Sequence, residues 1–168
     1  IYLMQYSVAR LGLDLHHDLL MFDAANQFLN GKLPFKDFFY QYNLGNVSLH
    51  MFALKFLGVR ILSLKIITAF SYTLIAVLIY LCSAYIVNWR IAVMASLMWS
   101  FLSPFLMPAM TGYHAWSTVY MMAFIMASGL CLTIAFTRYP FIWSFVAGIC
   151  LNLAFWFKQV SGIHILLI

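Results

Sequence analysis

The chain has 168 residues, of which 65% are hydrophobic and only 8% are charged, and its mean hydropathy is +0.96. An ordinary soluble domain is about a quarter charged and at most about half apolar, so this composition excludes soluble globular, disordered and disulfide-scaffold proteins. The net charge of +5 comes from cations scattered singly between apolar runs, which excludes the continuous basic stripe of a nucleic-acid-binding protein. We therefore expect an integral membrane protein and, because no initiator Met opens the chain, a part of a longer polypeptide.

The long apolar runs predict an all-α fold, a polytopic transmembrane helical bundle that forms a single domain. A helix that crosses a bilayer needs about 20 mostly apolar residues, because hydrocarbon offers no water to the backbone polar groups. On this basis, the predicted elements in chain order are the end of a first span at 1–13, a loop with short juxtamembrane helices at 14–58, spans at 61–87, 91–107, 116–136 and 141–157, and the start of another span at 160–168.

The loop at 14–58 contains two predicted helices and an aromatic strip. One helix begins after Asp18 and ends at Asn30-Gly31, as helices commonly end at glycine. The other covers residues 44–57 and ends at Gly58. Between them, aromatic residues surround Lys36, and two interpretations stay open: an aromatic belt at the membrane interface, or a lysine that meets a lipid phosphate.

Acidic residues occur only in this loop. All four are Asp, the first is Asp14, the last is Asp37, and the chain has no Glu. If the helix continues through the loop, Asp14 and Asp18 lie four residues apart on one face with His17 beside them. Two carboxylates so close resist joint ionisation, and a carboxylate poised in this way suits a general base that deprotonates a hydroxyl. Asp18 is therefore the candidate base, whereas Asp14 and Asp23 are expected to end helices at the headgroups.

The same residues offer a weaker case for a metal. Asp14, His17 and Asp18 carry the ligand types of a divalent metal site. However, neighbouring side chains on a helix point about 100° apart, and no HExxH pattern is present. A metal is therefore the disfavoured interpretation, and no other cofactor is predicted.

Lys158, at the end of the predicted span 141–157, is the second candidate site residue. By counting crossings, we expect Lys158, Gln159 and His114 to emerge on the same side of the membrane as Asp18. Lysine at a span end often reaches for the headgroups; the alternative is that its ammonium shares a pocket with Asp18. His50 lies within an apolar stretch and is expected to be packed.

Several motifs of the chain together resemble a known family. They are His16-His17-Asp18, Ala24-Ala25, Leu29-x-Gly31-x-x-Pro34-Phe35-x-Asp37-x-Phe39, Tyr42, Phe56-Leu57-Gly58 and, later, Phe157-Lys158-Gln159-x-x-Gly162. This pattern resembles the integral-membrane glycosyltransferases of the GT-C type, which include protein O-mannosyltransferases and aminoarabinose transferases.

The resemblance implies a polyprenyl-phosphate-linked sugar as the donor and a hydroxyl of a glycan, lipid or protein as the acceptor. It places the loop outside the cytoplasm, in the cell envelope at a bacterial inner membrane, and maps the catalytic base onto Asp18. The donor phosphate would meet three residues, which are Lys36, Lys158 and Gln159. The other expected pocket residues are Asp14, His17, Asp37, Tyr42 and His114.

Two other functions compete with the enzyme. A transporter or non-catalytic lipid-handling protein would carry charged or broken helices at mid-membrane, often in inverted repeats, and neither is evident in the sequence. A structural subunit would leave Asp18 solvated and far from Lys158. The enzymatic interpretation expects these two residues to share a wet pocket at one membrane face.

Overall fold

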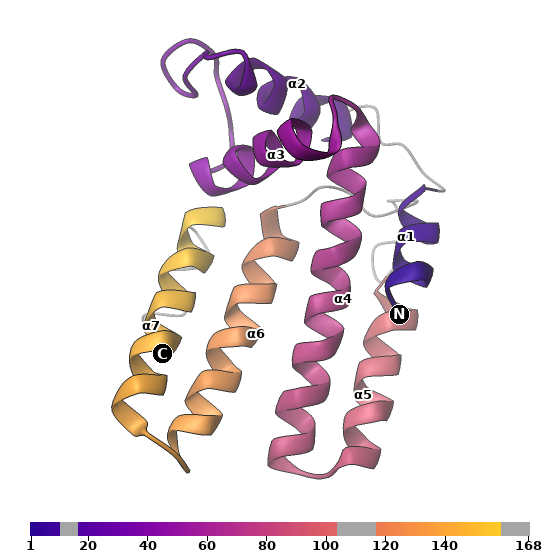
Figure 1. The fold of residues 1–168 in the computed structure, drawn as a ribbon, viewed down its shortest axis with the longest axis vertical. Helices are drawn as coiled ribbons and strands as arrows, with labels where there is room; N and C mark the ends of the chain where they lie inside the picture. The colour runs from indigo at the N-terminus through magenta and orange to yellow at the C-terminus, as the bar shows by residue number, and fades with distance from the viewer. Residues whose placement is uncertain (11–16, 104–116, 159–168) are drawn as a thin grey trace.

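The computed structural model describes residues 1–10, 17–103 and 117–158. These residues form helices and contain no β-strand ladder, which confirms the all-α prediction. The helices, shown in Figure 1, are α1 (Tyr2–Arg10), α2 (His17–Leu29), α3 (Leu44–Leu57), α4 (Ile61–Ile86), α5 (Trp89–Leu102), α6 (Ser117–Ala135) and α7 (Pro140–Phe157).

The helices α4, α5, α6 and α7 stand side by side as an up-and-down bundle (Figure 1). α4 packs against α5 and α6, and α6 packs against α7. Among the described residues, α4, α6 and α7 are long and apolar enough to cross a membrane, which indicates a membrane protein. α1 packs along α4, while α2 and α3 lie across one end of the bundle (Figure 1).

Local signals in the sequence set the helix ends. Gly31 and Gly58 adopt positive φ angles of 87° and 95° after α2 and α3, a backbone conformation that glycine adopts without strain. The side chain of Asn88 caps α5 by accepting the backbone N–H of Ile91 at 3.0 Å. Pro140 begins α7, where its missing N–H costs nothing.

The predicted ranges of α3, α4, α6 and α7 agree with the structure to within one residue at each end. The predicted span 91–107 corresponds to α5, which begins two residues earlier, at Trp89. Residues 160–168 lie outside the described part of the chain.

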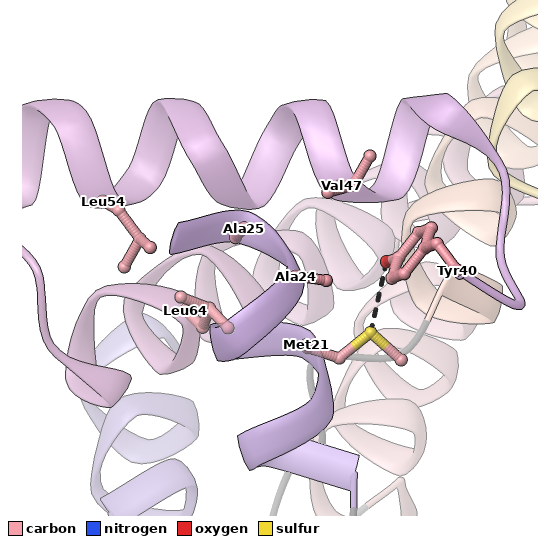
Figure 2. Packing of buried hydrophobic residues seen from close by; sticks show 7 residues of the cluster. All are labelled: Met21, Ala24, Ala25, Tyr40, Val47, Leu54 and Leu64. Atoms are coloured by element: carbon pink, nitrogen blue, oxygen red, sulfur yellow. Dashed lines mark hydrogen bonds between the residues drawn. The ribbon is translucent and has the colours of Figure 1, made fainter. Parts of the chain in front are cut away.

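A compact apolar cluster fixes α2 and α3 onto the start of α4. Figure 2 shows its buried side chains, which are Met21, Ala24 and Ala25 of α2, Tyr40 of the loop, Val47 and Leu54 of α3, and Leu64 of α4. The hydroxyl of Tyr40 donates to Sδ of Met21 at 3.3 Å, and Nδ2 of Asn46 donates to that hydroxyl at 2.8 Å. Burial raises the pKa of Tyr40, so its hydroxyl stays a neutral donor. The cluster therefore holds α2 and α3 as a fixed platform for the polar residues beside them.

Candidate functional site

A buried ion pair joins the platform to the bundle. Asp18 lies in the first turn of α2 and Lys65 lies in the second turn of α4. The Nζ atom of Lys65 is 2.7 Å from Oδ2 of Asp18, and the side chains are only 4% and 1% exposed. The position of Asp18 near the positive end of the α2 dipole further favours a carboxylate there.

Helical periodicity places both partners on the buried faces of their helices. Asp18, Met21 and Ala25 follow one another at spacings of three and four along α2, so they share its buried face. Lys65 lies on the buried side of α4 beside Leu64, which belongs to the apolar cluster. The hydrophobic pattern that docks α2 on α4 therefore also brings the carboxylate to the ammonium.

A second polar group borders the ion pair along α4. Nε2 of His50 lies 2.9 Å from the Tyr120 hydroxyl, which lies 2.9 Å from Oγ1 of Thr68. All three side chains are buried, and the rings of His50 and Tyr120 meet edge to face. Thr68 follows Lys65 by three residues, a spacing that puts both on one face of α4.

The other predicted cation has a different partner. Lys158 follows the last residue of α7, and α7 ends at the end of the bundle that carries α2 and α3 (Figure 1). Its ammonium donates to Oγ1 of Thr118 on α6 at 3.0 Å and is partly buried. Asp18 pairs instead with Lys65, and it is buried rather than facing a wet pocket. The expectation of a shared Asp18–Lys158 pocket is therefore corrected to an Asp18–Lys65 pair. The physical reason is lateral order: α2 packs on α3 and α4, whereas α7 packs on α6 and α3.

The remaining predicted loop residues lie nearer the surface. Lys36 and Asp37 are exposed, and Asp37 accepts the backbone N–H of Leu33 at 2.7 Å, which closes a turn of the loop. Tyr42 is half-buried and meets Tyr40 edge to face. His17, the first residue of α2, is half-buried.

Three predicted residues, Asp14, His114 and Gln159, lie outside the described part of the chain. Among the residues that are described, no group of three His, Cys, Asp or Glu side chains could hold a metal ion. The disfavoured metal set included Asp14, so the described residues contain only part of it.

Comparison with protein-family models, with curated proteins and with solved structures finds no match to this chain.

Lys65 is the residue that sequence reasoning missed. It lies inside the span predicted at 61–87, where a lone cation is costly and needs a partner. Because the acids of these 168 residues are confined to residues 14–37, an acidic partner from this part of the protein could only be one of four Asp residues. The two facts together would have pointed to an ion pair between the loop and this span.

A shallow groove opens at the same end of the bundle. It has a volume of about 240 Å³ and is lined by Phe35, Asn43, Leu44, Phe155 and Trp156. Nδ2 of Asn43 donates to the carbonyl of Phe155 at 3.0 Å, which joins the loop to the end of α7. The lining is mostly aromatic and aliphatic, so the groove suits an apolar chain.

Proposed function

We propose that the chain is part of a GT-C-type membrane glycosyltransferase that moves a sugar from a polyprenyl-phosphate donor to an acceptor hydroxyl. The observation that carries the proposal is the buried Asp18–Lys65 pair, which lies at one end of an apolar bundle. Burying two charges costs several kcal/mol per ion before their attraction is counted, so such a pair is weak evidence for stability. In the proposed reaction, the two charges would instead accept a proton and bind a phosphate.

In this mechanism the donor phosphate exchanges with the carboxylate at Lys65. An ammonium binds phosphate as readily as carboxylate, because it forms charge-assisted hydrogen bonds with both anions. Asp18 is then free to accept the proton of the acceptor hydroxyl while that oxygen attacks the anomeric carbon of the sugar. The bond from the anomeric carbon to the phosphate oxygen breaks, and the polyprenyl phosphate leaves with the bonding electrons. Lys65 offsets the charge that develops on it, with Lys36 and Lys158 as further cations.

The aromatic groove supports the lipid part of the proposal. Phe155 and Trp156 line it and come just before Lys158 in the chain. An isoprenoid chain in the groove would bring its phosphate toward the end of α7, where the ammonium of Lys158 is partly buried on Thr118. We propose that the catalytic face lies outside the cytoplasm in a bacterial inner membrane, as the resemblance implies.

The test is transfer from a lipid-linked sugar by the full-length protein in nanodiscs. Asp18→Asn removes the base and is expected to lower the rate by about 10²–10⁴-fold. Asp23→Asn is the matched control, because Asp23 lies on the same helix, is exposed and accepts a hydrogen bond from Gln27. The double variant Asp18→Asn/Lys65→Gln leaves no unpaired charge and separates loss of chemistry from loss of folding. Transfer at near wild-type rate by a folded Asp18→Asn protein refutes the proposal.

The groove also favours one alternative, a lipid-handling membrane protein without chemistry. Such a protein would bind the polyprenyl-phosphate sugar with similar affinity in wild-type and Asp18→Asn forms and would release it unchanged. Binding without turnover by the wild-type full-length protein, across several acceptors, would favour this alternative over the transferase.

A further inference from the structure

The hydrogen bonds around Tyr120 run in one direction. The hydroxyl of Thr68 donates its single proton to the carbonyl of Leu64, one turn earlier on α4, at 2.9 Å. Oγ1 of Thr68 can therefore only accept from Tyr120, whose own single proton is used in that bond. The Tyr120 oxygen in turn accepts from Nε2 of His50. The chain of donors fixes His50 as the tautomer protonated on Nε2.

The other ring nitrogen of His50 is then a bare acceptor. His50 is fully buried, and burial lowers its pKa to about 3, so the ring is neutral and carries one proton. Nδ1 has no hydrogen-bond partner among the described residues. Buried polar atoms are nearly always hydrogen-bonded in folded proteins, so this acceptor calls for a donor.

A second acceptor lies one turn earlier on the same helix. Asn46 is also fully buried, and its Oδ1 has no hydrogen-bond partner among the described residues. Its Nδ2 donates to the Tyr40 hydroxyl at 2.8 Å and to Sδ of Met21 at 3.2 Å, contacts that orient the amide. Positions 46 and 50 are four apart on α3, where side-chain bases lie about 5–6 Å from each other. One small molecule can bridge two acceptors at this separation.

We propose that Nδ1 of His50 and Oδ1 of Asn46 form a buried acceptor site that takes a neutral O–H donor, either a water molecule or the hydroxyl of a polyol. A water carries two protons, one for each acceptor, and a buried water needs two to four polar partners. A cation is disfavoured as the occupant of this site, because the ammonium of Lys65 would repel it. Lys65 lies on the same face of α4 as Thr68, which accepts the last hydrogen bond in the series from His50 through Tyr120. The site does not depend on the transferase proposal.

The test is nitrogen NMR of isotope-labelled histidine in the full-length protein, in nanodiscs at neutral pH. We expect His50 protonated on Nε2, with Nδ1 shifted as a hydrogen-bonded acceptor. If this shift is present without added polyol and the ring receives magnetisation from solvent water, the donor is water; the shift without that transfer comes from a protein group and overturns the proposal. If it appears only after glycerol is added, the donor is a polyol hydroxyl. Protonation on Nδ1, a charged ring, or a bare Nδ1 without a hydrogen bond in both samples overturns the proposal.

Two variants make the assignment specific. Asn46→Leu removes the second acceptor and is expected to weaken the hydrogen-bond shift of Nδ1 while the tautomer of His50 stays unchanged. Tyr120→Phe removes the acceptor that fixes the tautomer and is expected to give a mixture of both protonated forms. If Asn46→Leu does not fold, Tyr120→Phe still tests the donor chain. An unchanged single tautomer in Tyr120→Phe contradicts it.

Discussion

Replacing Lys65 with Met removes the ammonium from the ion pair and leaves the Asp18 carboxylate almost fully buried. Removing one partner of a buried pair costs about 3–5 kcal/mol, because the other charge stays buried and loses its ion-pair partner. Replacing both partners, as in Asp18→Leu/Lys65→Met, is expected to be neutral or to stabilise by about 1–4 kcal/mol, because neither desolvation cost remains. The double variant should therefore be more stable than the Lys65→Met variant.

The assay is denaturant unfolding of the full-length protein in detergent, followed by tryptophan fluorescence, for wild type, both single variants and the double variant. This cycle isolates the coupling between the two positions. Lys55→Met on α3 is the control, because Lys55 is exposed and should change stability by less than about 0.5 kcal/mol. A cost below about 1 kcal/mol for Lys65→Met, typical of surface pairs, would refute the claim that the pair is buried.

Three further predictions use the same unfolding measurement. The pKa of His50 falls from 6.5 to about 3 on folding; the unfolded chain therefore binds a proton that the folded chain refuses, and stability drops as the pH falls from about 6.5 toward 3. At about 1.4 kcal/mol for each pH unit, the full loss of stability is about 5 kcal/mol. His50→Gln should make the stability less dependent on pH in this range. If the pH dependence is the same in His50→Gln and wild type, the burial of the ring is contradicted. In Gly45→Ala, the new Cβ would lie 2.7 Å from the backbone oxygen of Trp156, so we expect a loss of about 1–3 kcal/mol. In Gly129→Ala the new Cβ meets open space, so this variant should be neutral or stabilising. If Gly45→Ala and Gly129→Ala change stability equally, the close approach of Gly45 to the Trp156 backbone is refuted. Asn88→Ala removes the cap of α5 and should cost about 1 kcal/mol, while Asn88→Asp should cost little; equal costs would exclude the capping role.

The sequence was sufficient to predict the helices because their signals are local. The apolar runs are long enough to identify α4, α6 and α7, and single residues mark several ends. Gly58 follows α3 with a positive φ, and Asn88, which lies between the predicted spans 61–87 and 91–107, caps α5. Such signals depend on the backbone preferences of one residue and its immediate neighbours, so no knowledge of the packing is needed.

The partner of Asp18 could not be predicted from the order of the helices alone. Counting crossings tells which helix ends share a side of the membrane, but it does not tell which helices are neighbours. The choice between Lys65 and Lys158 depends on α2 docking against α4 through the apolar cluster around Met21 and Leu64. The same holds for His50, which was expected to be packed but whose partners Tyr120 and Thr68 come from two other helices.

The burial of the ion pair bears on the proposed function. A structural subunit would leave Asp18 solvated, yet the carboxylate is 1% exposed and paired with Lys65. In a chain that is only 8% charged, two apolar residues at these positions would hold α2 on α4 at least as well. Stability alone therefore does not account for the charges, whereas the proposed transferase would use them as a base and a phosphate-binding cation. If the apolar double variant folds as well as wild type but transfers no sugar, the pair is kept for its chemistry.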